Sequence, residues 1–137
     1  MKYYFAVFMP TVEEHYAVEF PDFPEGFTQG NDLADCLVMG ADVLAIAVEE
    51  YAKARKPLPE PSSFEQVKAW AERQKGSEGL VPDRDFLFQL FQAPSVDMTP
   101  VRVSVSFAKS ALDAIDAKAK RAGFTRSGFL AHAAQHY

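Results

Sequence analysis

The chain has 137 residues, of which 48% are hydrophobic and 13% aromatic, with one cysteine and a formal net charge of −5. This composition excludes a disordered chain and a disulfide-stabilised scaffold, and no apolar stretch reaches the length of a membrane span. The chain opens on a strand-like segment, residues 2–8, without the pattern of a secretory signal. Together with the lone cysteine, this favours a reducing, bacterial-type cytoplasm.

The charge is divided unevenly along the chain. Residues 100–137 contain six basic and two acidic side chains, a net charge of +4, whereas residues 1–99 contain eight basic and seventeen acidic side chains, a net charge of −9. Such a division suggests that the two parts bind different partners. The alternative is that the acidic and basic parts simply attract each other. The sequence motifs described below distinguish these two possibilities.

Two segments near the N-terminus, residues 3–9 and 15–20, are predicted to be strands. The second alternates between large apolar side chains and small or charged ones. Residues 21–26 contain two prolines, which lack a backbone donor and restrict the residue before them. We therefore expect a rigid turn or an edge segment there, followed by a short third strand at residues 27–28 that ends at Gly30.

A long helix is predicted to begin at Asp32, a favourable N-cap residue, and to end before a proline-rich stretch at residues 57–61. Apolar side chains at helical spacing mark the face that should be buried: Leu33, Leu37, Ala41, Leu44, Val48 and Tyr51.

Three further segments complete the N-terminal part. Ser62 or Ser63 is expected to cap a shorter helix, residues 86–91 form a further strand, and residues 93–100 form a linker closed by proline. The pattern leaves the role of residues 64–85 open.

Residues 100–137 begin with strict alternation and then become helical. Four apolar side chains share one face of the expected strand and three polar ones share the other: Val101, Val103, Val105 and Phe107 against Arg102, Ser104 and Ser106. A helix follows that should end at Gly123, and Thr125 is placed to cap another. So short a segment cannot cover its own apolar faces. Two copies can do so by pairing their strands as an antiparallel ribbon over four helices.

This arrangement resembles the ribbon-helix-helix family of DNA-binding proteins. The resemblance implies a homodimer whose ribbon enters the major groove of operator DNA. By position, the residues that would read base edges are Arg102, Ser104 and Ser106. Those that would hold a phosphate group at the start of the second helix are Thr125, Arg126 and Ser127. One departure is Ala108, which opens the first helix where the family commonly has Pro, Ser or Asp.

Two questions about this segment stay open. It could serve only for dimerisation, with the polar face of its strand exposed to solvent. A net charge of +4 is not expected of a module that only dimerises. The sequence also leaves open whether two such dimers join into a tetramer.

The N-terminal part resembles the HicB antitoxin family. The resemblance rests on a strand that ends in Pro21-Asp22-Phe23-Pro24, on Thr28-Gln29-Gly30, on the capped helix and on the proline-rich stretch after it. It covers residues 1–61 and resumes near Phe86.

This resemblance implies an α+β fold. Residues 1–95 would form a partial RNase-H-like domain, an antiparallel sheet with a packed helix, and residues 100–137 the ribbon-helix-helix domain. It further implies an antitoxin of a type II toxin–antitoxin module, which inhibits a small mRNA-cleaving RNase of the HicA type and represses its own operon. The expected toxin contacts are Glu19, Asp22, Phe23 and Pro24. The alternative is that Phe23 belongs to the core and the prolines only shape the turn.

Enzymatic activity is not expected. A metal-dependent nuclease needs several converging carboxylates, and the strand-borne candidates reduce to Glu19 and Asp22. His132 and His136 lie one helical turn apart but have no third ligand, and Cys36 is most simply a buried apolar residue. We therefore expect no metal, no cofactor and no membrane partner. The competing hypothesis is a ribbon-helix-helix repressor whose N-terminal domain senses a small ligand. A neighbouring reading frame for a short basic protein would favour the antitoxin.

Overall fold

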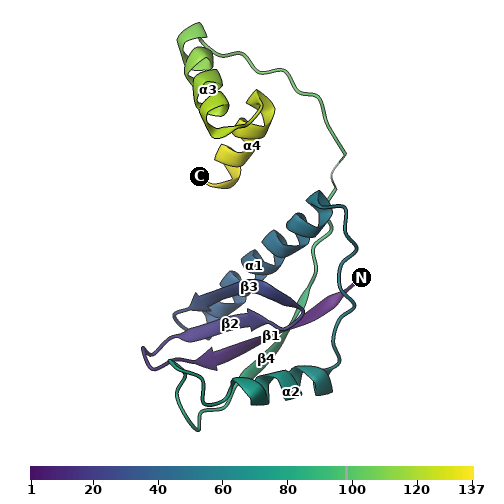
Figure 1. Cartoon of the computed structure of the whole chain (residues 1–137), viewed down its shortest axis with the longest axis vertical. Coiled ribbons are helices and arrows are strands. Elements are labelled where there is room, and N and C mark those ends of the chain that lie inside the picture. The colour runs from purple at the N-terminus through teal and green to yellow at the C-terminus, as the bar shows by residue number, and fades with distance from the viewer. Residues whose placement is uncertain (98) are drawn as a thin grey trace. The chain divides into compact units, whose positions relative to one another are not determined.

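A computed structural model describes residues 1–97 and 99–137 of the chain. These residues divide into two compact units, Met1–Thr99 and Pro100–Tyr137, called here the N-terminal and C-terminal units (Figure 1). The predicted linker, residues 93–100, includes Met98, which lies outside the described residues.

The N-terminal unit contains a four-stranded antiparallel sheet with the order β3-β2-β1-β4 (Figure 1). Its strands are β1 (Tyr3–Pro10), β2 (Tyr16–Phe20), β3 (Phe23–Gly30) and β4 (Leu87–Gln92). The first three strands follow one another as hairpins, whereas β4 joins the free side of β1 after two helices. The sequence predictions for β1, β2 and β4 are confirmed to within one residue at each end.

Strand β3 starts earlier than the sequence suggested. Residues 21–26 were expected to be a turn or an edge segment, but β3 already begins at Phe23. Its pairing with β2 is irregular, because Phe20 pairs with Phe23 and Glu19 with Phe27. The three residues between them, Pro24 included, therefore bulge out of the ladder on an edge strand. This is where a residue without a backbone donor is tolerated.

Helix α1 (Leu33–Lys53) covers one face of the sheet. Asp32 caps it as predicted, accepting a hydrogen bond of 2.8 Å from the Asp35 amide. The buried side of α1 repeats every fourth residue: Cys36, Gly40, Leu44 and Val48. With strand residues they form the first apolar cluster, whose buried members on the sheet are Tyr4, Ala6, Phe8, Val18, Phe20 and Phe23.

The predicted buried face of α1 is correct only in its second half. Leu33, Leu37 and Ala41 are exposed, whereas the smaller Cys36 and Gly40 face the sheet. The reason is the closeness of the helix to the sheet. A Cβ atom added at Gly40 would lie 2.7 Å from the Phe91 ring, so any larger residue would force this ring to shift.

Helix α2 (Phe64–Gln74) covers the opposite face of the sheet and gives residues 64–85 a role. Ser63 caps it in a reciprocal capping box with Gln66. Val67 and Ala71 are buried against the sheet in a second apolar cluster. The remaining members of that cluster are Val7 and Met9, with Phe5, Ala17, Trp70, Leu80, Phe86 and Phe88 packed against them. The sheet is therefore covered on both faces, by α1 on one and by α2 on the other (Figure 1).

Gly30 allows the start of α1 to pack directly on the end of β3. A Cβ atom at Gly30 would lie 2.6 Å from Cys36 Sγ and 2.8 Å from the Cys36 backbone nitrogen. We expect Gly30→Ala to lower the free energy of unfolding by about 1–3 kcal/mol, because backbone must move to admit the methyl group. Urea unfolding of this variant beside Gln29→Ala, an exposed neighbour on the same strand, checks the expectation. Equal stability of the two variants would contradict it.

The C-terminal unit contains α3 (Lys109–Ala122) and α4 (Arg126–Gln135). Gly123 ends α3 in the left-handed conformation, with φ of 76°, and Thr125 caps α4, both as predicted. Ala108 makes no side-chain cap at the start of α3. Of the predicted apolar positions, Ala119 is buried, Ala122 and Ala133 are exposed, and the others are half-buried: Leu112, Ile115, Phe129 and Leu130.

Candidate functional sites

Residues 101–107, predicted to be a strand, belong to no helix or strand of the described chain, because no described strand pairs with them. Their apolar side chains lie open to solvent, with exposed fractions of 81% for Val101, 74% for Val103, 68% for Val105 and 41% for Phe107. The alternating polar residues, Arg102, Ser104 and Ser106, are exposed as well. An exposed apolar face of this size beside an unpaired backbone is typical of a surface that binds a partner.

The start of α4 brings together the residues predicted to hold a phosphate. The Thr125 hydroxyl accepts a hydrogen bond of 3.1 Å from the Gly128 amide. Arg126 and Ser127 are exposed in the first turn. This leaves a helix N-terminus whose dipole favours an anion.

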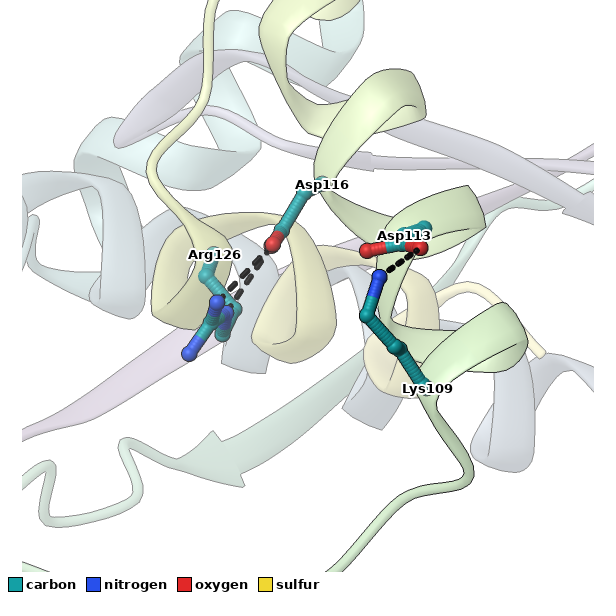
Figure 2. A network of polar contacts seen from close by, with 4 residues as sticks. All are labelled: Lys109, Asp113, Asp116 and Arg126. Carbon is teal, nitrogen blue, oxygen red and sulfur yellow. Dashed lines mark hydrogen bonds and ion pairs between the residues drawn. The ribbon is translucent and has the colours of Figure 1, made fainter.

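Arg126 is not a free cation in this arrangement. Its Nε and one terminal nitrogen donate to the two carboxylate oxygens of Asp116 on α3, at 2.9 and 2.8 Å (Figure 2). These hydrogen bonds lower the pKa of Asp116. One turn earlier on α3, Lys109 contacts Asp113 at 3.3 Å (Figure 2). The sequence analysis identified Arg126 but missed Asp116, which lies ten residues away across the turn.

The Pro21–Pro24 motif is split between core and surface. Phe23 is only 3% exposed, and its ring contacts those of Tyr4 and Tyr51 edge-on, with centroids 4.7 and 5.6 Å away. This is the position that the core alternative expects. Pro24 is exposed on the bulge of β3.

Asp22 holds the proline-rich stretch against the sheet. Its carboxylate accepts hydrogen bonds from both the backbone amide and the hydroxyl of Ser62. Nearby, the Tyr4 hydroxyl donates to the Pro59 carbonyl at 2.6 Å, and Lys2 pairs with Glu60 at 2.7 Å. Burial, followed by the nearby charge of Asp22, raises the pKa of Tyr4. Asp22 therefore has a structural role that the sequence analysis did not foresee.

Glu19 lies on the opposite side of β2 from the first apolar cluster, because its neighbours Val18 and Phe20 belong to that cluster. It is half-buried, and the burial raises the pKa of its carboxyl group. On the described chain its cross-strand partners are Val7 and Phe27, and Phe27 is 67% exposed.

A groove of about 690 Å³ lies between β3 and the C-terminal half of α1. Its apolar lining includes Pro24, Ile46 and Tyr51, and the charged side chains around it are Glu25, Glu50 and Lys56. No pattern in the sequence had predicted this groove. The available signal was Ile46, an apolar residue on α1 outside the predicted buried face.

The remaining candidates from the sequence are a metal site, the pair of C-terminal histidines and Cys36. The described part of the chain has no group of three or more His, Cys, Asp or Glu side chains placed to hold a metal ion. The His132 and His136 rings stack on each other with centroids 4.1 Å apart. Cys36 is fully buried, and this burial raises the pKa of its thiol, so it is the inert apolar residue that was expected. Among residues 1–97 and 99–137, no helix is long and apolar enough to span a bilayer.

Comparison with solved structures identifies the fold. The crystal structure of the antitoxin HicB from Burkholderia pseudomallei superimposes with a TM-score of 0.70 and 24% identity, over 99% of this chain and 96% of the other. A toxin–antitoxin complex from Streptococcus pneumoniae gives a TM-score of 0.61 and 24% identity, over 98% and 97%. The α+β fold expected from the sequence is thus confirmed.

Comparison with known sequences identifies the family. Antitoxin HicB 2 of Photorhabdus laumondii is 39% identical over 51 residues, which are 37% of this chain and 37% of that protein. Antitoxin HicB 1 of the same organism is 39% identical over 57 residues, 42% of this chain and 37% of that protein. The matches span just over a third of these relatives' lengths. The model of the HicB-like antitoxins of bacterial toxin–antitoxin systems, by contrast, matches residues 4–134, and the chain belongs to this family.

Proposed function

We propose that this antitoxin binds and inhibits a small RNase toxin through its N-terminal unit and represses its own operon through its C-terminal unit. The observation that supports the operator-binding part of this proposal is the alternating segment 101–107, whose apolar side chains are exposed in the described chain. Because the family consists of antitoxins, we assign no enzymatic activity, in agreement with the sequence analysis.

Dimerisation through a two-stranded ribbon accounts for the C-terminal unit. Ala119 is the only buried residue of this unit, so a single copy has almost no core. Pairing residues 101–107 of two copies would satisfy the backbone and bury the apolar faces of both strands on four helices. We therefore propose an obligate homodimer.

Operator binding follows from the opposite face of the same ribbon. In a dimer that buries the valine side, Arg102, Ser104 and Ser106 point away from the core, where they can donate to base edges in a major groove. The net charge of +4 on residues 100–137 supports a polyanionic partner.

Arg102→Ala tests base reading. We expect it to weaken operator binding by about 1–3 kcal/mol and to relax one base position, because an arginine fork on guanine is lost. Titration against operator and random duplex separates base-specific binding from binding to the DNA backbone. Equal losses on both duplexes would mean that Arg102 contacts only the DNA backbone.

Asp116→Asn tests the phosphate site. Asp116 neutralises Arg126 at the α4 N-terminus, so its removal should release the guanidinium for phosphate. We expect tighter binding to operator and random duplex alike. The slope of the logarithm of the binding constant against the logarithm of the salt concentration should become steeper by about one unit. Asp113→Asn is the matched control, because it removes the same charge one turn away and leaves Arg126 paired. Identical behaviour of the two variants would contradict this role of Asp116.

Toxin inhibition is proposed for residues 1–95, because these residues have a net charge of −8, from eight basic and sixteen acidic side chains, and contain the Pro-Asp-Phe-Pro motif. An acidic surface speeds encounter with a basic RNase and competes with its RNA. The test is whether residues 1–96 alone suppress RNA cleavage by the product of the adjacent reading frame. A folded domain that leaves cleavage unchanged would refute the assignment.

A further inference from the structure

We propose that the groove between β3 and the C-terminal half of α1 is the surface on which the toxin docks, and that it receives an apolar side chain flanked by lysine or arginine. This inference rests on the proposed toxin binding and names the surface that performs it.

The groove presents apolar groups that the fold itself does not use. Ile46 is 60% exposed, whereas Leu44 and Val48 on the same helix are buried in the core. Tyr51 lies at the same wall, with its ring packed edge-on against the buried Phe23. An exposed isoleucine beside an ordered aromatic ring is the kind of surface that receives a partner's anchor residue.

The wall opposite α1 is the edge strand β3. Within the described chain β3 pairs only with β2, so its outer backbone edge has no strand partner. The bulge between Phe23 and Phe27 carries the exposed Pro24 and Glu25 at this edge. The proline and the bulge hinder the addition of a fifth strand, which favours side-chain docking over strand pairing.

The charges around the groove select a basic partner. Glu25 and Glu50 border it, and the Glu50 side chain is 68% exposed although Lys53 lies 3.9 Å from it on the same helix. Lys56 is the single basic residue in the lining. A second copy of this acidic unit would bring two net charges of −9 together, and DNA would meet the same repulsion. A basic protein is therefore the occupant that the electrostatics favour.

Ile46→Ser and Val38→Ser in the full-length chain form the decisive pair of variants. Both residues are exposed aliphatic side chains on α1, at 60% and 59%, but only Ile46 lines the groove. The probe is the purified product of the adjacent reading frame. We expect Ile46→Ser to weaken its binding about tenfold or more, as for an interface anchor, and Val38→Ser to change it by less than about twofold.

Two double variants test the contribution of the charges around the groove independently of its apolar packing. The double variant Glu25→Gln/Glu50→Gln removes two charges at the groove, and Glu13→Gln/Glu78→Gln removes two exposed charges elsewhere on the same unit. We expect the first double variant to slow association with the probe several-fold more than the second. Its association rate should also depend less on salt concentration. Thermal unfolding of every variant checks that each is folded.

The outcomes separate the two proposals. Failure of the unaltered chain to bind the probe would overturn toxin binding itself. Binding that both groove variants leave at the level of their controls would overturn only the groove assignment. Sedimentation of the chain alone completes the test: a change of association state in Ile46→Ser would show that the groove holds a second copy and would also overturn the inference.

Discussion

Truncation of the chain after Val96 is expected to leave a folded acidic domain that has lost all DNA binding and no longer dimerises through the ribbon. Both apolar clusters lie within the retained residues, and Val96 itself packs against the first apolar cluster, so the cut removes no residue of either cluster. The lost part holds the proposed ribbon and both helices of the C-terminal unit. Circular dichroism, sedimentation and titration with operator duplex measure the three expected results.

Two sets of substitutions separate dimerisation from DNA reading in the full-length chain. Val103→Ser with Val105→Ser polarises the apolar face of the ribbon and should produce monomers that do not bind operator. Ser104→Ala with Ser106→Ala alters only the opposite face and should leave the dimer intact while weakening operator binding. A full-length chain that sediments as a monomer at micromolar concentration would contradict the ribbon, as would a truncated chain that retains operator binding.

Phe23→Ala is expected to cost about 3–5 kcal/mol of the free energy of unfolding, because it removes a buried aromatic ring and leaves a cavity. Phe23 joins the sheet to α1 through its contacts with Tyr4 and Tyr51. A loss of this size is a large part of the stability of a domain of about 100 residues.

Phe27→Ala is the matched control for this prediction. Phe27 lies on the same strand with 67% of its surface exposed, so its truncation should change stability by less than about 1 kcal/mol. Chemical unfolding of both variants measures the difference. A stable Phe23→Ala variant that had nevertheless lost toxin binding would mean that Phe23 acts as a contact and not as a core residue.

The elements of the fold were predictable because their signals are local. Alternation predicted β2, a strand-like apolar run predicted β1, and the caps Asp32 and Thr125 predicted helix starts. The buried side of α1 was not predictable from periodicity, because both sides of its first half are apolar. The choice depends on Gly30 and Gly40, which let the helix approach the sheet closely at positions where a larger residue would clash. This steric constraint arises only when the helix is packed on the sheet, so the sequence pattern alone does not reveal it.

The candidate sites were predictable as segments but not as contacts. Asp22 accepts a hydrogen bond from Ser62, forty residues away, and Asp116 pairs with Arg126 across a turn. Neither contact follows from the helical or strand periodicity of the sequence. The groove at Ile46 likewise needs β3 and α1 side by side. The segment at residues 101–107 is the opposite case, because its alternation is visible in the sequence and the structure leaves its apolar side chains exposed.

The most direct test of the antitoxin function is co-expression of the full-length chain with the product of the adjacent reading frame, followed by purification through a tag on that product. The account predicts that the chain restores growth in cells that express the toxin and that the two proteins elute as one complex. This complex should contain an even number of copies of the chain, because the ribbon pairs them. Growth arrest that persists at full expression of the folded chain, with no complex recovered, would contradict the account.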